Sequence, residues 1–250
     1  MPKSVETLLH VTRERLDRVE ADIRASLSDA AALEHAAQTF AQQIYETFVD
    51  STVLVRVYAT VPFERLPVAQ QKFVTDLASS KNALARLVAH TPVLSLVGTC
   101  GVDPSWCDRH HSKGHVGIPL IDTQFVEAIP MVARLLHELG VDPLWFDDPT
   151  GSFVRRLIGG FNGVFYVSDA ATSKDAKGRH VIPARDFVAE HRVSTVFGMG
   201  GSYLDGTLVA CIVFTREDIP RAQAEQLATL ISTLKTATAT LVRSGRIFVD

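Results

Sequence analysis

The stretch from Val193 to Val242 has the clearest pattern of apolar and polar positions in the chain. Residues 193–199 alternate small polar and apolar side chains, whereas residues 207–214 are nearly all apolar. Asp205-Gly206 separates the two runs, and Asp-Gly favours a tight hairpin because glycine readily adopts the positive φ that such turns need. We therefore expect two antiparallel strands, the second lying in the centre of a sheet with both faces covered.

A long helix is expected to close the chain, because the residues of one stripe after Asp218 recur every three or four positions. The stripe consists of Leu227, Leu230, Ile231, Leu234, Ala237, Thr238 and Leu241. Residues 4–27 show a similar spacing, close to a heptad repeat, at Val5, Leu9, Thr12, Leu16, Val19, Ile23 and Leu27. Two interpretations of this first helix are open: it packs on its own domain, or it forms the seam of a parallel dimer.

Four further runs rich in β-branched residues predict strands at residues 52–60, 93–99, 118–121 and 163–168. Pro119 places the third of these at a sheet edge, where a missing N–H does no harm. Helices are expected at residues 30–50, with Ser28-Asp29 as the cap, at residues 123–140, with an interruption at Pro130, and at residues 183–191.

The order of these elements predicts an α+β fold with a mostly antiparallel six-stranded sheet and helices packed on one side. Short, regular β-helix-β units are absent from the pattern, which weighs against a doubly wound parallel sheet. We expect an N-terminal helical extension at residues 1–29 and one domain at residues 30–250 that ends in the long helix.

Charge and composition exclude several classes of protein. The 250 residues carry a formal net charge of −3, so no field suited to a phosphate backbone exists, and nucleic-acid binding is not expected. No apolar run has the length of a membrane span. Three cysteines without regular spacing argue against a disulfide framework and for a reducing, cytoplasmic environment.

Several of these segments resemble GAF-type sensory domains. The similarity is clearest at residues 193–242, where an apolar strand ends in Cys211-Ile212-Val213-Phe214 and acidic Glu217-Asp218 leads into the closing helix. Residues 33–60 resemble the opening helix and first strand of that fold, so the similarity extends over about residues 30–244. Segments at 114–120, 129–133 and 165–170 resemble a divergent GAF-like group that stands ahead of histidine kinases and nucleotide cyclases in bacterial signalling proteins.

The resemblance implies a six-stranded antiparallel sheet, a ligand pocket on the face opposite the terminal helices, and dimerisation through those helices. The chain lacks the Asn-Lys…Phe…Asp-Glu signature of cyclic-nucleotide-binding members and a Cys-His pair of the kind that carries a bilin in phytochromes. A kinase, cyclase or phosphodiesterase catalytic segment is also missing from the 250 residues. The resemblance therefore predicts a dimeric domain that senses an unidentified small molecule, with a histidine kinase or nucleotide cyclase as its effector.

Thiol and imidazole side chains gather in one stretch: Cys100, Cys107, His110, His111 and His115. Thiolate and imidazole are the usual ligands of zinc, and a haem needs only one axial histidine. The spacing matches no zinc finger or ribbon, however, and a solvated or capping polar loop is the favoured interpretation. A metal- or haem-binding redox protein, or a thiol enzyme using Cys100 and Cys107, is therefore the alternative function.

The same loop also fits the wall of a ligand pocket. Asp103, Trp106, Arg109 and His115 would offer charge and an aromatic face to a small polar ligand. Long loops in compact domains are often functional. The simpler interpretation is that Trp106 only plugs the end of the core.

Two further groups of residues are candidates for ligand contact. Arg56 is the one charge in the strand at 52–60, and it either reaches a sheet edge, pairs with a carboxylate or lines the pocket. Tyr166, Asp169 and Arg185 form a second candidate lining, in which Arg185 either holds an anion through its forked donors or pairs with an acidic neighbour such as Asp186. Catalysis has little support, because Ser168 and Ser202 lack a Gly-x-Ser-x-Gly frame and Cys211 lies among apolar residues.

Overall fold

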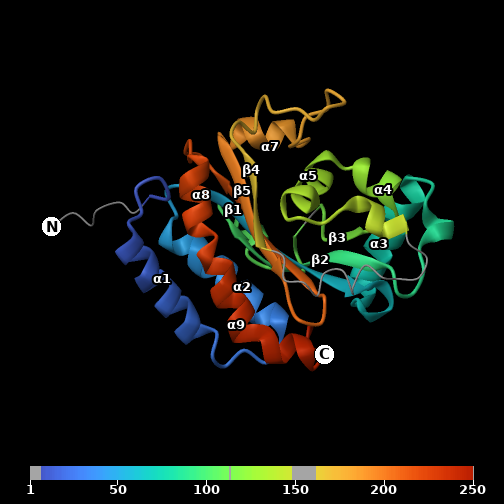
Figure 1. Ribbon diagram of the computed structural model, residues 1–250, viewed down its shortest axis with the longest axis horizontal. Helices are drawn as coiled ribbons and strands as arrows, with labels where there is room; N and C mark the ends of the chain where they lie inside the picture. Colours follow the sequence, from blue (N-terminus) through green and yellow to red (C-terminus); the bar gives the residue numbers. More distant parts are fainter. Residues whose placement is uncertain (1–6, 113, 148–161, 250) are drawn as a thin grey trace.

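The computed structural model describes residues 7–112, 114–147 and 162–249. In this part of the chain, six strands form one sheet in the order β3-β2-β1-β6-β5-β4, and every neighbouring pair is antiparallel (Figure 1). The strands are β1 (Thr52–Pro62), β2 (Pro92–Gly101), β3 (Gly117–Pro119), β4 (Asn162–Val167), β5 (Thr195–Ser202) and β6 (Leu208–Thr215). The predicted α+β fold class is confirmed.

The hairpin of β5 and β6 has the form that the apolar pattern predicts. Strand β6 lies between β1 and β5, and all of its residues are buried. Gly206 adopts φ 85° in the connecting turn, a conformation that favours glycine. The short strand β3 lies at the sheet edge, where Pro119 leaves no gap in the ladder.

Four helices cover one face of the sheet: α1 (Arg13–Ser26), α2 (Leu33–Thr47), α8 (Arg221–Leu227) and α9 (Thr229–Arg243) (Figure 1). The single long closing helix that we expected is wrong in one respect, because it is divided at Ala228. Ala228 keeps right-handed helical backbone angles, and Leu227 and Leu230 on either side are both buried. The apolar stripe therefore runs through the break, which explains why its periodicity predicts one helix.

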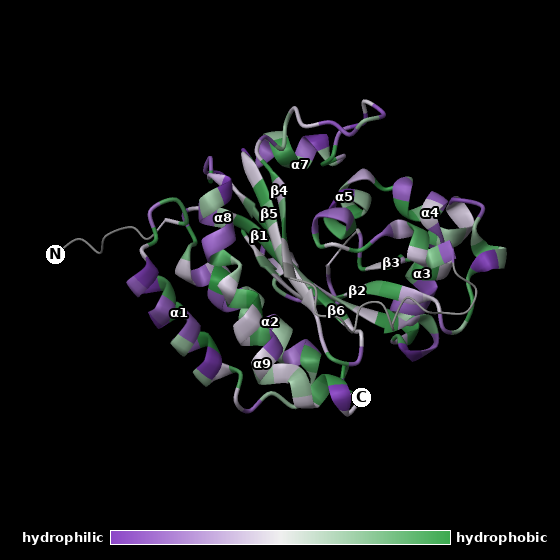
Figure 2. Ribbon diagram, viewed as in Figure 1, coloured by the Kyte–Doolittle hydropathy of each residue, from purple (hydrophilic) through white to green (hydrophobic). Residues whose placement is uncertain are grey.

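Helix α1 packs on α9 and α2 within the same chain. Leu16, Val19 and Ile23 are each at most 2% exposed, so this apolar stripe is covered by the chain itself. The helix begins at Arg13 with Thr12 as its cap rather than at residue 4, and residues 1–6 lie outside the described residues. Hydrophilic positions follow the outer side of α1, whereas hydrophobic positions lie between the helices and the sheet (Figure 2). Helix α1 thus contributes its apolar stripe to the hydrophobic core of the described residues.

The first turn of α2 is capped by the C-terminal tail. The N–H groups of Leu33 and Glu34 donate to the carbonyl oxygens of Arg246 and Ile247, each over 2.9 Å. The helix starts at Leu33 after Ala32, so the expectation that Ser28-Asp29 caps it is wrong. The tail supplies the acceptors that a local side chain normally provides at a helix start.

Glycine at position 98 lets α2 lie close to β2. A Cβ atom at Gly98 would stand 2.4 Å from the carbonyl carbon and oxygen of Ala37, far inside van der Waals contact. The sheet and the helix therefore pack backbone to backbone at this point.

Shorter elements cover the opposite face and the β3 edge. They are η1 (Phe63–Arg65), α3 (Val68–Ser80), η2 (Leu84–Arg86), η3 (Pro104–Trp106), α4 (Thr123–Glu127), α5 (Pro130–Glu138), η4 (Pro143–Asp147) and α7 (Arg185–Glu190). Pro130 starts α5 after α4 has ended, as its position predicts. None of the helices in the described ranges combines the length and the apolar character that a bilayer span requires.

Candidate functional site

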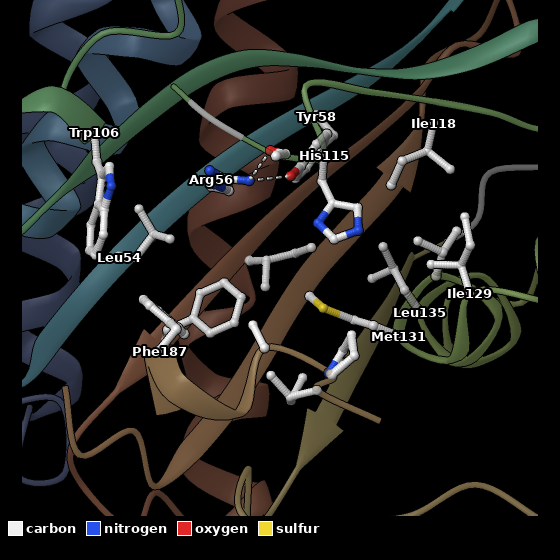
Figure 3. Close-up of a pocket in the computed structure, with 17 residues that line it drawn as sticks. Leu54, Arg56, Tyr58, Trp106, His115, Ile118, Ile129, Met131, Leu135 and Phe187 are labelled. Atoms are coloured by element: carbon white, nitrogen blue, oxygen red, sulfur yellow. Dashed lines mark hydrogen bonds between the residues drawn. The ribbon is translucent and has the colours of Figure 1, made fainter. Parts of the chain in front are cut away.

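A cavity of about 360 Å³ lies between the sheet and the short elements on the face opposite the terminal helices (Figure 3). Its walls come from the strands β1, β3 and β6, the loop after β2, helix α5 and the start of α7. The lining residues are Leu54, Arg56, Tyr58, Trp106, Gly114, His115, Ile118, Ile129, Met131, Val132, Leu135, Ile182, Pro183, Ala184, Phe187, Ile212 and Phe214.

The alternation of β1 directs Arg56 into this cavity. Side chains two positions apart on a strand share a face, so Leu54, Arg56 and Tyr58 line the cavity while Val55 and Val57 enter the core beneath the terminal helices. Arg56 stands opposite Ile212 of β6, another lining residue. Arg56 is thus one of the residues that line the cavity.

Hydrogen bonds join the guanidinium of Arg56 to oxygen atoms of Tyr58, Ser112 and Gly114. Its Nη1 donates to the carbonyl oxygen of Gly114 over 2.9 Å and to the Tyr58 hydroxyl over 3.3 Å (Figure 3). Its Nη2 donates to Ser112 Oγ over 2.9 Å. Two of these partners belong to the loop after β2. Arg56 therefore holds that loop against the sheet.

His115 stands beside Arg56 at the cavity wall (Figure 3). More than a third of the residue is exposed, yet partial burial, followed by the charges of Arg56 and Lys81, lowers the pKa of its imidazole. The backbone of His115 adopts φ 50°, in the left-handed region that few residues other than glycine and asparagine occupy. The lowered pKa favours a neutral imidazole, so His115 adds little positive charge beside Arg56.

Aromatic rings form another wall of the cavity. Trp106 and Phe187 pack edge to face with centroids 5.7 Å apart, and Phe187 and Phe214 do the same at 5.5 Å. Met131 faces the open space from the side of α5 (Figure 3). The described residues that line the cavity include no aspartate or glutamate. The cavity is apolar except for the corner at Arg56, Tyr58 and His115.

Three of the predicted ligand-binding residues, Arg56, Trp106 and His115, come together in this cavity. Asp103 and Arg109 do not line it. Asp103 accepts a hydrogen bond from the N–H of Ser105 and begins the turn of η3. Arg109 turns toward the terminal helices, and the prediction that both residues form the pocket wall is therefore not supported by their positions.

The second predicted lining is divided between two places. Tyr166 packs on the side of the terminal helices, where its hydroxyl donates to the carbonyl oxygen of Ile219 over 2.7 Å. Asp169 and Arg185 line a separate hollow of about 400 Å³ next to Asp218. The Thr172 hydroxyl, which donates to the carboxylate, lowers the pKa of Asp169. These three residues do not line the cavity between the sheet and α5.

The five residues proposed as metal ligands are not assembled into one site. Cys100 and Cys107 have neighbouring thiols on the side of the terminal helices, whereas His115 lines the cavity. His111 Nδ1 lies 2.9 Å from Asp108 Oδ2, and His110 Nε2 lies 3.9 Å from Glu34 Oε1. Among the residues that the structure describes, no three His, Cys, Asp or Glu side chains gather as a metal site. The loop folds over the sheet end, and this separates the predicted ligands.

Sequence reasoning missed most of the apolar lining. Leu54 and Tyr58 have a usable signal, since strand alternation puts them on the same face as Arg56. Phe214 and Ile212 follow by the same rule in β6. The segment around Phe187 carries no local sign that it reaches the cavity.

One loop contacts both faces of the sheet. We call residues 102–112 and 114–116 the cavity loop. On the helical side, Gln38 Nε2 of α2 donates to the Cys107 carbonyl oxygen over 3.0 Å, and the guanidinium of Arg109 lies 5.1 Å above the Phe248 ring. On the other side, Ser112 and Gly114 accept from Arg56. The cavity loop thus joins the cavity to α2 and the C-terminal tail.

Comparisons with known structures return GAF domains and related folds. The GAF domain of Acinetobacter phosphoenolpyruvate-protein phosphotransferase is 13% identical, covers 95% of this chain and 100% of its own, and has a TM-score of 0.47. Free methionine-R-sulfoxide reductase from Neisseria meningitidis, in complex with its substrate, is 11% identical, with coverage of 96% and 98% and a TM-score of 0.49. The phycoerythrobilin-bound GAF domain of a cyanobacterial phytochrome is 13% identical, with coverage of 94% and 98% and a TM-score of 0.43.

The chain has a GAF-like fold. Six antiparallel strands, terminal helices on one face and a cavity on the other are the architecture that the resemblance in the sequence implies. No protein-family model and no curated protein sequence matches the chain. All three TM-scores lie below 0.5, and at 11–13% identity the likeness concerns the fold alone.

Proposed function

We propose that this GAF-like chain is a sensory domain that binds a small molecule in the cavity between the sheet and α5. The cavity itself is the observation that carries the proposal. Ligand pockets commonly have volumes of about 300–1,000 Å³, mostly apolar walls and a few convergent polar groups. This cavity has about 360 Å³, aromatic and aliphatic walls, and one polar corner at Arg56, Tyr58 and His115.

The cavity loop offers a route from the ligand to the helical face. A ligand at Arg56 would contact the same guanidinium that holds Ser112 and Gly114. The loop also carries Arg109, which pairs with Glu34 in the first turn of α2. A ligand acts on the helices only through a difference in affinity between two arrangements. In this proposal the two arrangements differ in how the cavity loop lies against Arg56.

The output is proposed to be bacterial signal transduction in the cytoplasm. The terminal helices would act on an effector of the histidine kinase or nucleotide cyclase kind, and the domain would work as a homodimer. Because the apolar stripe of α1 is buried in its own chain, such a dimer would have to use the outer, charged surface of the helices. Mass measurement in solution tests this part, and a monomer at every concentration would contradict it.

A thiol enzyme centred on Cys100 and Cys107 has less support. Burial, followed by the hydrogen bond with Cys107, raises the pKa of the Cys100 thiol. The nucleophile in thiol chemistry is the thiolate, and a raised pKa leaves little of it near neutral pH. The cavity therefore gives the better account of what the site does.

A thermal-shift screen of small metabolites tests the proposal on the full chain. A ligand of the cavity raises the melting temperature of the wild type, because it binds the native state alone. Met131→Trp fills the cavity, and Leu144→Trp serves as the control at a residue that is 64% exposed. The proposal predicts a shift for the wild type and the Leu144 variant but none for the Met131 variant. No shift with any compound, or equal shifts in all three proteins, would overturn it.

A further inference from the structure

The charges around the cavity favour a ligand with a negative charge. Arg56 places a guanidinium in the wall, and the described lining residues include no aspartate or glutamate. The positive charge of Lys81 also reaches this end, since it contributes to the lowered pKa of His115. A cationic ligand would face repulsion here, whereas an anion would gain attraction in a region of reduced dielectric.

The position of Arg56 also selects for the shape of the anion. A guanidinium donates in a planar fork that matches the two oxygen atoms of a carboxylate. Three acceptors of Arg56, namely Tyr58 Oη, Gly114 O and Ser112 Oγ, are neutral. Hydrogen bonds to a charged acceptor are about twice as strong as those between neutral groups. A carboxylate would therefore compete successfully with the cavity loop for this side chain.

The remainder of the cavity suits a flat, apolar body. Trp106, Phe187 and Phe214 form a continuous edge-to-face series of rings along one wall. An aromatic ring of a ligand would extend this series through further edge-to-face contacts. Such contacts stabilise binding beyond the contribution of the buried area. On the facing side Met131, a flexible side chain that adapts to irregular shapes, contacts the space. The aromatic wall and Arg56 are approached from one open space (Figure 3).

We infer that the cavity takes a small aromatic carboxylate, with its carboxylate at Arg56 and its ring against Trp106, Phe187 and Phe214. This inference rests on the proposed function and names the ligand class of the same cavity. It also identifies the event that starts the signal. The carboxylate replaces Ser112 and Gly114 on the guanidinium, and the cavity loop leaves its present position against the sheet.

The test compares an acid with its uncharged amide on the full chain. The probes are 1-naphthylacetate and 1-naphthylacetamide, which share the same ring, and their affinities are measured by calorimetry. The acid is expected to bind at least about tenfold more tightly than the amide, a factor that charge-assisted hydrogen bonds readily supply. Octanoate, an acid without a ring, is expected to bind more weakly than the aromatic acid. Tighter binding of octanoate would overturn the aromatic part of the inference.

Two variants test whether the difference in affinity between the acid and the amide arises at Arg56. Arg56→Gln should reduce the affinity for the acid by about tenfold and leave that for the amide nearly unchanged. Arg24→Gln removes the same charge from an exposed position on α1 and should change neither affinity. If Arg56→Gln fails to fold, the comparison of acid and amide on the wild type still decides the matter.

The outcomes separate this inference from the proposed function. Equal affinities of acid and amide, or tighter binding of the amide, would overturn the carboxylate while leaving a cavity that binds ligands. Failure of both probes to bind would also overturn the ligand class, and the metabolite screen with the Met131 variant would then decide whether the cavity binds anything. Binding that survives Met131→Trp would place the probes elsewhere and overturn the inference.

Discussion

Arg109 and Glu34 form a buried ion pair in which Nη2 lies 2.5 Å from Oε2, and this pair joins the cavity loop to the first turn of α2. The side chains are 7% and 10% exposed. Glu34 also lies at the positive end of the helix dipole, which favours its charge. The pair holds the loop on the helical side, just as Arg56 holds it on the cavity side.

Arg109→Met should destabilise the fold by about 3–5 kcal/mol, because it leaves the charge of Glu34 buried without its partner. Urea unfolding measures the change. The control is the double variant Glu34→Gln/Arg109→Met, which removes both charges and should lose less stability than the sum of the single variants. Strictly additive losses would contradict an interaction between the two residues.

Gly98→Ala should destabilise the domain by about 1–3 kcal/mol or more, since the new methyl group would enter the backbone of Ala37. Gly178→Ala is the control for backbone strain. Gly178 has a φ of 75°, which strains an alanine, but there is open space where its Cβ would lie, so no steric clash arises. Thermal unfolding of both variants makes the comparison. A larger loss in the Gly178 variant than in the Gly98 variant would contradict the close packing of α2 on β2.

Native-state stability should fall as the pH drops below about 6.5, the usual pKa of histidine, in part through His115. Its pKa is lowered in the folded protein, so the unfolded chain binds more protons in this range and acid favours unfolding. Above the unfolded pKa this contribution is fully present. His115→Asn keeps a residue that tolerates the positive φ and should flatten the acid side of the stability curve.

The measurement for His115 is the melting temperature between about pH 5 and pH 7.5, the range in which histidines titrate. His90→Asn, at an exposed position outside the cavity lining, is the control. An unchanged pH profile in the His115 variant, or equal changes in both variants, would show that another group governs the acid response.

The three cysteines should differ in their reaction with the thiol reagent DTNB. Cys107 is partly exposed, whereas Cys100 and Cys211 are buried and burial raises the pKa of each of these two thiols. We expect one fast thiol in the native protein and three after denaturation. Cys107→Ser should remove the fast reaction, and a fast phase that persists in this variant would contradict the burial of the others.

The sequence predicts the strands well because burial on a sheet leaves a periodic trace. The alternation in β1 and the apolar run of β6 place Arg56 on a strand next to the hairpin, and the structure bears out both elements. The cavity on the face opposite the terminal helices does not follow from this pattern, and its position is implied only by the resemblance to GAF-type domains.

A periodic pattern does not predict which face of the sheet each loop residue reaches. Cys107, Arg109 and His115 are close in sequence but reach opposite faces, because a loop has no period that fixes direction. The start of α2 fails for a related reason. Its cap comes from the carbonyl oxygens of Arg246 and Ile247, far along the chain, so local residues hold no sign of it.

That capping contact has a mechanical consequence. The backbone of Arg246 and Ile247 is fastened to the first turn of α2, and the next residue, Phe248, lies beneath Arg109 of the cavity loop. A pull or a twist on the chain after Phe248 would act first on these contacts and only later on the sheet. If a ligand moves the cavity loop as proposed, thermodynamic linkage requires that tension on this tail alter the affinity of the cavity in turn.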